Sequence, residues 1–258
     1  MSDVEFVFPT KTKAISLTGD KCSLNCAHCN RHYLKQMSSV DEAMGCDGVE
    51  SILVSGGCDA QGEVPLTNFT HEIAELKKRY RIIAHTGLFA PEKAHMLKGL
   101  VDVVSFDFPS SDRAIEEVYG IGKTQADYID SLCSLMKEVP AIPHVTIGMR
   151  AGVIEGELDA LETLSGLGLK RVVLNVLVPT PGTRYANINP PEMSQVLRII
   201  KHARKLFSSV YLGCVRPSGE YRRKLDSGAL EYVDRIVMPS KEIVGGKEKI
   251  FNECCGFR

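Results

Sequence analysis

The chain has 258 residues and a formal net charge of −1, with 31 Lys and Arg against 32 Asp and Glu. This balance gives no electrostatic case for binding nucleic acid or an anionic membrane surface. No apolar run approaches the ~20 residues of a membrane-spanning helix, and residues 1–5 lack the basic-then-apolar pattern of a signal peptide. These two features predict a cytoplasmic location. Nine cysteines in a cytoplasmic chain indicate metal or redox chemistry, because disulfides rarely persist there.

Short apolar strands alternate with amphipathic helices along the whole chain, which is the pattern of β/α units around a parallel sheet. The predicted strands are residues 13–19, 51–55, 81–85, 101–106, 144–149, 171–178, 210–215 and 234–238. The predicted helices are residues 68–80, 91–100, 125–139, 158–167, 191–207 and 219–232. This count predicts a single domain, residues 1–258, that forms a complete (β/α)8 TIM-type barrel.

A short C-terminal extension, about residues 245–258, follows the last predicted strand. We expect residues 247–258 to close the barrel as a short helix that carries Cys254 and Cys255.

Polar, glycine, proline and cysteine residues lie at or just after the carboxyl ends of the predicted strands. They are Asp20, Gly56-Gly57-Cys58, His85, Asp107, Arg150, Asn175, Pro179, Cys214, Arg216, Ser240 and Lys241. Because barrels of this type build their sites from the loops at the carboxyl ends of the strands, we expect these residues to surround one site.

A loop with three cysteines follows the first predicted strand. Cys22, Cys26 and Cys29 are separated by four and three residues. Three cysteines can ligate three irons of a four-iron cluster, and the fourth iron then has no ligand from this motif. An open iron of this kind can bind a small chelating molecule.

The cysteine spacing resembles that of the radical S-adenosylmethionine enzymes. The resemblance implies a [4Fe-4S] cluster whose open iron takes the amino and carboxylate groups of S-adenosylmethionine. In that family an electron from the cluster splits the sulfonium and releases a 5′-deoxyadenosyl radical. His28 matches the ring-bearing residue often found before the third cysteine.

A glycine-rich segment, Ser55-Gly56-Gly57, resembles the family segment whose backbone meets the amino group of S-adenosylmethionine. Glycine permits such an approach because it has no Cβ. The family pattern often continues with Glu, whereas this chain has Cys58. Taken alone, the segment could also be a plain tight turn.

Two later segments resemble the biotin synthase-like branch of the family, so that the resemblance spans residues 13–255. Residues 152–157 look like its G-x-I-x-G segment, which implies that Ile154 packs on the adenine. Residues 174–183 look like its sixth-strand segment, which implies that Asn175, Leu177 and Val178 line the nucleoside pocket. Asp107 and Arg150 are candidates for polar contacts to the ribose or the carboxylate of the cofactor.

The remaining cysteines predict a second, auxiliary iron–sulfur cluster. Cys58, Cys214, Cys254 and Cys255 are its candidate ligands, and Cys46 is a further one. Cys214 and Arg216 alternate on a predicted strand, so both should face the same side of it. The alternative is that Cys254 and Cys255 form only a reactive tail.

The segment 216–222 and the Cys254-Cys255 pair resemble the short biotin synthase-like proteins that act as paired lipoyl synthases. The resemblance implies sulfur insertion at C6 and C8 of an octanoyl chain on a carrier-protein lysine, with Arg216 as the candidate catalytic residue. It implies as partners an octanoylated carrier protein or peptide, an electron donor such as ferredoxin or flavodoxin, and a paired homologous subunit.

Two other interpretations stay open. One is a different radical reaction on the same scaffold, such as a carbon-skeleton rearrangement or a cofactor-maturase step. The other is a non-catalytic iron–sulfur or zinc protein, with zinc completed by His28, His32 or Cys46. Metal content would separate the three interpretations.

Overall fold

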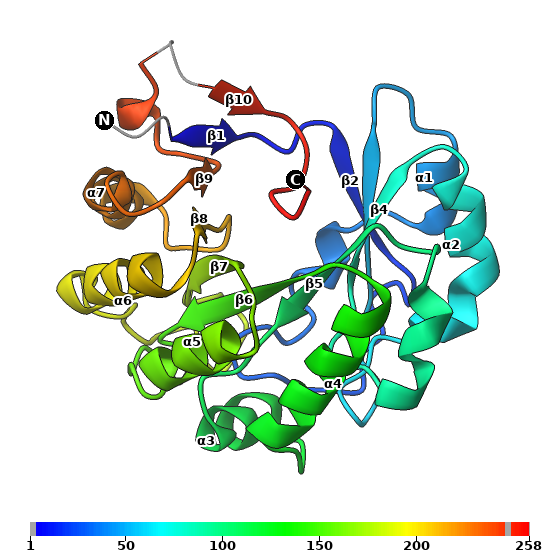
Figure 1. Ribbon diagram of the computed structural model, residues 1–258, viewed down its shortest axis with the longest axis horizontal. Helices are drawn as coiled ribbons and strands as arrows, with labels where there is room; N and C mark the ends of the chain where they lie inside the picture. The colour runs from blue at the N-terminus through cyan, green and yellow to red at the C-terminus, as the bar shows by residue number, and fades with distance from the viewer. Residues whose placement is uncertain (1–3, 246–248, 258) are drawn as a thin grey trace.

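The computed structural model describes residues 4–245 and 249–257. The described chain forms one curled sheet of ten parallel strands, with the helices on its outer side (Figure 1). Residues 246–248 and 258 of the predicted C-terminal extension, and residues 1–3, lie outside the described residues.

The strands are β1 (Glu5–Val7), β2 (Thr12–Ser16), β3 (Ser51–Ser55), β4 (Arg81–His85), β5 (Val103–Asp107), β6 (Ala141–Ile147), β7 (Arg171–Val176), β8 (Ser209–Leu212), β9 (Arg235–Val237) and β10 (Lys249–Phe251). The eight predicted strands correspond to β2–β9, with ends shifted by up to three residues. The short strands β1 and β10 were not predicted.

The α-helices are α1 (Val40–Met44), α2 (Thr70–Lys77), α3 (Asp112–Ala114), α4 (Gln125–Glu138), α5 (Glu157–Gly166), α6 (Met193–Leu206) and α7 (Gly219–Ala229). Shorter helical turns are η1 (Leu34–Gln36), η2 (Leu66–Phe69), η3 (Pro91–Leu97), η4 (Ile115–Tyr119) and η5 (Lys241–Ile243). The helix predicted at 91–100 is the 3₁₀ helix η3, and α1, α3 and η4 were not predicted.

The sheet stays open, in the order β10-β1-β9-β8-β7-β6-β5-β4-β3-β2. Among the described residues, β2 forms one edge and β10 the other, so the closed eight-strand ring that we expected is not present. The reason is that β1 pairs with β9 through Glu5↔Arg235 and Val7↔Val237. It thereby takes the edge that β2 would need to close the ring.

The C-terminal tail, residues 249–257, adopts an extended conformation where we expected a helix. It forms β10 and then a turn inside the curl of the sheet (Figure 1). Backbone hydrogen bonds from Phe8 N to Phe251 O (2.9 Å) and from Lys11 N to Asn252 O (2.8 Å) hold it against the β1–β2 connection. These bonds use backbone groups that a helix would need for itself.

Two hydrophobic cores result from the alternation of side chains along the strands. The larger core lies between the sheet and the helices. The inner core contains Val7, Ile83, Val103, Ile142, Val173, Tyr211 and Val237 from the strands and Phe251, Cys255 and Phe257 from the tail. The tail therefore fills part of the interior.

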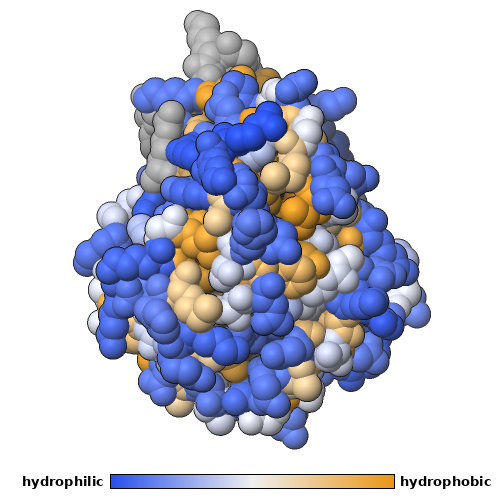
Figure 2. All heavy atoms as spheres, turned by 90° about the vertical axis from the view of Figure 1, so that its right-hand side faces the viewer, coloured by the Kyte–Doolittle hydropathy of each residue, from blue (hydrophilic) through white to orange (hydrophobic). Residues whose placement is uncertain are grey.

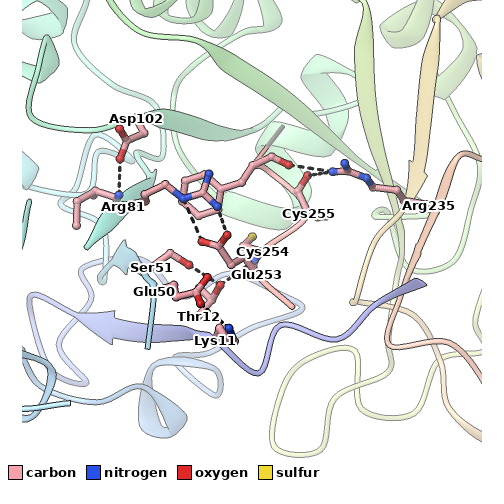
Figure 3. Close-up of polar contacts among 12 residues, drawn as sticks. Lys11, Thr12, Glu50, Ser51, Arg81, Asp102, Arg235, Glu253, Cys254 and Cys255 are labelled. Carbon is pink, nitrogen blue, oxygen red and sulfur yellow. Dashed lines mark hydrogen bonds and ion pairs between the residues drawn. The ribbon is translucent and has the colours of Figure 1, made fainter. Parts of the chain in front are cut away.

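Arg235 holds the end of the tail in place (Figure 3). Its guanidinium donates hydrogen bonds to the carbonyl oxygens of Cys255 (3.2 Å) and Phe257 (2.9 Å). It also forms an ion pair with Glu5 (2.6 Å) and lies over the ring of Phe251. Only 7% of Arg235 is exposed, so these contacts are shielded from water.

Arg81 and Thr12 hold the start of the same turn. Arg81 forms an ion pair with Glu253 and lies 4.4 Å from the ring centroid of Phe257. Cys254 N donates to Thr12 Oγ1 at 2.7 Å. The tail therefore pairs with β1 as the edge strand β10 and is also bonded to β2, the opposite edge strand, through Thr12.

None of the helices among the described residues is long and apolar enough to span a membrane. Figure 2 shows the face that carries α1 and α2, where hydrophilic residues predominate around a band of hydrophobic ones.

We predict that Arg235→Met destabilises the metal-free protein by about 3 kcal/mol, because it leaves a half-buried Glu5 carboxylate and two carbonyls without their guanidinium. Urea unfolding measures this change. Lys78→Ala removes an exposed helical ion pair with Glu75 and should cost less than about 0.5 kcal/mol. Equal effects of the two variants would contradict the anchoring role of Arg235.

Candidate functional site

The three-cysteine loop follows β2 and is shaped by its own backbone hydrogen bonds. Cys26 O accepts from Cys29 N (3.2 Å) and Asn30 N (3.1 Å), and Cys29 O accepts from His32 N (2.8 Å). Asn30 and Arg31 have positive φ values of 40° and 63°, which turn the chain sharply after the third cysteine. All three predicted cysteine ligands are half-buried in this compact loop.

The loop is bound to distant parts of the chain. Ala27 N donates to Val118 O (2.8 Å), and Ala27 O accepts from Tyr185 N (3.2 Å). Asn30 Nδ2 donates to Gly182 O at 3.0 Å. The loop is therefore held between η4 and the segment after β7.

A small cluster of apolar residues packs against the same loop. Ala27 is fully buried and packs with Val118, Met149 and Leu177. Met149 follows β6 and Leu177 follows β7, so the cysteines lie at the carboxyl ends of the strands, as expected. Leu177, a predicted cofactor-pocket residue, is itself 2% exposed and supports the cysteine loop.

The predicted glycine-rich segment packs directly on the cysteine loop. A Cβ on Gly57 would lie 1.9 Å from Lys21 O and 2.6 Å from Cys22 Cβ. A Cβ on Gly56 would lie 3.3 Å from Thr18, whose hydroxyl accepts a hydrogen bond from Gly57 N at 2.7 Å. These contacts require glycine at position 57, so the segment is more than a plain turn.

Cys58 belongs with the loop cysteines. Its N–H donates to Cys22 Sγ at 3.2 Å, and its carbonyl accepts from Ser23 N at 2.8 Å. The Cys58 thiol also donates a hydrogen bond to Cys22, which lowers the pKa of Cys22 to about 6. The same hydrogen bond and burial raise the pKa of Cys58.

The other two loop cysteines resist ionisation in the absence of a cation. Burial, reinforced by negative charge on Cys29 and Cys22, raises the pKa of Cys26 to about 12. Burial is also the main cause that raises the pKa of Cys29. Several thiolates gathered away from water repel one another, and bound iron would offset that repulsion.

Two buried polar atoms, one in the loop and one on β7, lack hydrogen-bond partners. His28 lies edge-on to Tyr119 with 6.0 Å between ring centroids, and its Nδ1 is buried and unpartnered. Burial lowers the pKa of His28 to about 4, so its ring is neutral. Asn175 Oδ1 is also unpartnered, and a Cβ on Gly213 would lie 2.0 Å from it. Such atoms are costly to leave unsatisfied, which fits a site that receives a polar ligand.

A single zinc ion is a poorer fit than a cluster. Among the described residues, no three His, Cys, Asp or Glu side chains converge on one metal position. A cluster spreads its thiolates over several irons, so convergence is not required. Cys46 lies elsewhere, with its sulfur 2.9 Å from Lys13 Nζ and 3.0 Å from Glu42 O.

Asp107 lies at the end of β5 and faces the hollow of the curled sheet. Its side chain is 54% exposed, and desolvation by the surrounding protein raises its pKa. His85 Nδ1 lies 3.9 Å from Asp107 Oδ2. The pocket at this point is lined by Asp107, Phe108, Pro109, Ser110, Tyr119, His144, Thr146 and Met149.

His144 on β6 lines this pocket and Ser105 on β5 contacts it, although neither was among the predicted site residues. Ser105 Oγ lies 2.8 Å from His144 Nε2, and the His85 ring stands edge-on to that of His144 at 5.7 Å. Burial lowers the pKa of His144 to about 3. The alternation of side chains along a strand could have predicted them, because Ser105 lies on the same face of its strand as Asp107, and His144 on the same face as Thr146.

Arg150 is held by protein carboxylates. Its Nε lies 2.7 Å from Glu117 Oε2, and its Nη1 forms an ion pair with Glu155. The neighbouring Ile154 is half-buried against the larger core. Both residues position the loop after β6, and a cofactor contact by either stays a prediction.

Glycines bring this loop close to the pocket wall. Gly156 has φ of 86°, and a Cβ there would lie 2.3 Å from Ser110 O. Ser55, on the inner face of β3, is 8% exposed, and Val178 is half-buried after β7. Of the predicted cofactor residues, Asp107 lines the pocket, and a contact with the cofactor stays a prediction for all of them.

Arg216, the candidate catalytic residue, lies buried between α7 and the ends of β8 and β9. It is 2% exposed and forms a bidentate pair with Asp226 through Nε (2.8 Å) and Nη2 (3.1 Å). Its other N–H groups donate to the carbonyl oxygens of Gly213, Val237 and Met238. Each of its five donors has a protein acceptor, so Arg216 joins α7 to the ends of β8 and β9 and has none left for a substrate.

Cys214, which is exposed, lies near enough to Cys254 and Cys255 for the charges of the three thiols to act on one another. Desolvation by the surrounding protein and the charge of Cys254 raise the pKa of Cys214, and Cys214 in turn helps to raise that of Cys255. The Cys254 and Cys255 thiols are hydrogen-bonded, which lowers the pKa of Cys254. The structure therefore separates Cys58 from the other three predicted ligands of a second cluster.

No protein-family model matches the chain. Over 124 residues it is 32% identical to biotin synthases of Ruthia magnifica subsp. Calyptogena magnifica and Vesicomyosocius okutanii subsp. Calyptogena okutanii (strain HA). The match covers 46% of this chain and 37% of those proteins.

Solved structures show the same kind of fold. A methylornithine synthase aligns with a TM-score of 0.63 at 11% identity, covering 97% of this chain and 79% of that one. An HMG-CoA lyase from Acenitobacter baumannii gives 0.53 at 12% identity, covering 92% and 75%. A radical S-adenosylmethionine methyltransferase from Kitasatospora setae gives 0.50 at 15% identity, covering 69% and 38%. The chain therefore has a TIM-barrel-type parallel α/β fold.

We predict that Asp226→Ala destabilises the metal-free protein by about 3–5 kcal/mol, because it leaves the buried Arg216 guanidinium without its counter-charge. Lys224→Ala, which breaks an exposed pair with Glu220 on the same helix, serves as the control in urea unfolding. Wild-type stability in Asp226→Ala would contradict the structural role of Arg216.

We predict that His144 makes stability fall as the pH is lowered. The folded protein holds His144 neutral down to about pH 3, whereas the unfolded chain protonates it near 6.5, so the unfolded state binds more protons between these values. Relative to His144→Gln, the wild type should lose about 2 kcal/mol more between pH 7.5 and pH 5. Urea unfolding of the metal-free proteins measures this, with exposed His95→Gln as the control; parallel pH profiles for wild type and His144→Gln would contradict it.

Proposed function

We propose that this protein is a radical S-adenosylmethionine enzyme of the biotin synthase-like type that inserts sulfur at an unactivated C–H carbon. The observation that carries the proposal is the packing of Gly57 against Cys22, which holds a three-cysteine loop at the strand ends, where Asp107, Tyr119 and Met149 line a pocket. The similarity to biotin synthases over 124 residues supports the same chemistry.

In this proposal Cys22, Cys26 and Cys29 hold a four-iron cluster with one open iron. When bound, the cluster and S-adenosylmethionine supply a carbon-centred radical, which side-chain acids and bases cannot generate from an aliphatic C–H bond. The protein positions the reactants and excludes water.

The residues around the hollow would bind the nucleoside part of the cofactor. The Asp107 carboxylate can accept hydrogen bonds from ribose hydroxyls, and its pocket adjoins Tyr119 and Met149, which reach the cysteine loop. The unpartnered His28 Nδ1 and Asn175 Oδ1 offer further polar contacts. Ser55, Gly56, Ile154 and Val178 stay candidate contacts from the surrounding strand ends.

We place the second cluster on Cys214, Cys254 and Cys255, because their thiols influence one another. The anchoring of the tail by Arg235 and Arg81 would hold two of these ligands in position. Sulfide of such a cluster would be the source of the inserted sulfur, as the resemblance to paired lipoyl synthases implies.

The substrate class that we favour is an octanoyl chain on a carrier-protein lysine or peptide. The residues that carry this choice are the 216–222 segment and the Cys254-Cys255 pair. A ferredoxin or flavodoxin as electron donor and a paired homologous subunit belong to the same proposal. Because Arg216 is occupied internally, recognition of the carrier does not include that residue.

A second candidate is a rearrangement or hydrogen abstraction on a polar substrate. The inner faces of β4–β6 carry His85, Ser105, Asp107, His144 and Thr146, where a purely aliphatic chain would find few apolar partners. This candidate needs no second cluster, so iron content distinguishes it from sulfur insertion.

We predict that a Cys22/Cys26/Cys29→Ala triple variant loses about half of the iron and sulfide of the anaerobically reconstituted wild type, keeping the second cluster alone. Iron analysis and Mössbauer spectra measure this. Complete loss would remove the sulfur source and favour the second candidate. Full retention would overturn the radical proposal itself.

The matched variants are Cys254→Ala and Cys255→Ala for the second cluster, with Cys46→Ala and Cys133→Ala as controls outside both cysteine groups. Only the tail variants should lose the iron and sulfide of the second cluster, and this loss should not depend on S-adenosylmethionine. With both clusters in place, product formation on an octanoyl-lysine peptide tests the substrate.

A further inference from the structure

Cys58 lies next to the cysteine loop. Neither the proposed second cluster nor the close approach of Gly57 explains why a cysteine is found at this position. Both backbone polar groups of Cys58 are hydrogen-bonded to the cysteine loop. Its N–H donates to Cys22 Sγ, and its carbonyl accepts from Ser23 N. These two contacts fix the Cα of Cys58 beside the loop whatever its side chain does.

The side chain of Cys58 also faces the cysteines. Its thiol is hydrogen-bonded to Cys22, and Cys22, Cys26 and Asp59 act on it electrostatically. The three cysteines of the loop and Cys58, in the segment after β3, therefore lie near enough to act on one another electrostatically.

A four-iron cluster has four irons to ligate, and the loop supplies three thiolates. A fourth thiolate at the rim of the same group is a ligand of the type that iron–sulfur clusters use. Cys58 is half-buried and packs on the larger core, so little conformational freedom is lost when its sulfur binds.

We infer that Cys58 is a fourth protein ligand, which occupies the open iron of the loop cluster as long as S-adenosylmethionine is absent. This inference rests on the proposed function, because it needs that cluster. Binding of S-adenosylmethionine breaks the iron–sulfur bond to Cys58 and forms bonds from iron to the amino nitrogen and a carboxylate oxygen. The released thiolate takes a proton from solvent, and no electron is transferred.

Two consequences follow. A cluster capped by four thiolates keeps all its irons during mild oxidation, whereas an open iron is easily lost. S-adenosylmethionine must also compete with Cys58, so the cap weakens its apparent affinity. Cys58 thereby protects the cluster and sets the cofactor concentration at which it opens.

The experiment compares anaerobically reconstituted full-length wild type with Cys58→Ala and Cys58→Ser, with Cys133→Ala on α4 as the matched cysteine control. Each protein is treated with limiting ferricyanide without S-adenosylmethionine, and electron paramagnetic resonance follows the signal of a three-iron cluster. We expect at least about tenfold faster signal growth in Cys58→Ala, suppressed by added S-adenosylmethionine, and about tenfold tighter binding of S-adenosylmethionine. Cys58→Ser should be intermediate, because its oxygen is a weaker iron ligand.

Iron analysis before oxidation shows that each variant has assembled its cluster, so a folding defect is recognised separately. Equal rates and equal affinities in wild type and Cys58→Ala would overturn the ligand role and leave Cys58 as a hydrogen-bond donor to Cys22 only. Absence of a four-iron cluster from the wild type would overturn the proposed function and this inference together. A cluster that binds S-adenosylmethionine without any effect of Cys58 would overturn this inference alone.

Discussion

The close approach of Gly57 to the cysteine loop is the contact on which the candidate site depends. With Lys21 O only 1.9 Å from where a Cβ would lie, no larger residue could bring β3 this near to Cys22. The approach sets three features at once: the Thr18–Gly57 hydrogen bond, the Cys58–Cys22 hydrogen bond and the depth of the loop. The loop is then held from the opposite side by Ala27, which packs on residues after β6 and β7. Contacts on two sides thus hold the cysteine loop, and with it several thiolates, in one position.

The open sheet and its internal tail form the second constraint. A sheet with two edges would leave unpaired backbone groups and an unfilled interior. Here β1 extends one edge, the tail is bonded between β1 and β2, and Phe257 and Cys255 enter the inner core. At the carboxyl ends of β5 and β6, Asp107, His144 and Thr146 line a pocket. One arrangement therefore supplies both a filled end, which stabilises the fold, and a polar end, which can receive a ligand.

Local sequence predicted the strands and the cysteine loop well, because apolar runs and cysteine spacing are local properties. It did not predict the position of Arg216. Alternation placed Arg216 beside Cys214 on one face, but β8 ends at Leu212, and beyond it the rule has no basis. The partner of Arg216 is Asp226 on α7, whose sequence neighbours give no sign of burial. Cys58 was likewise grouped with Cys214 by residue type, although its contacts are with Cys22.

The sequence by itself determined the order of β/α units, the three-cysteine spacing and the glycines that a close approach requires, because each depends on residues near one another in the chain. Only the tertiary structure decided which edge strand pairs with β9, which cysteines share a location, and which charged groups are already neutralised. Those outcomes depend on contacts between residues far apart in sequence, such as Thr12 with Cys254 and Arg235 with Phe257. Competition among many such partners is settled by packing and hydrogen bonding in the folded chain, which local pattern does not encode.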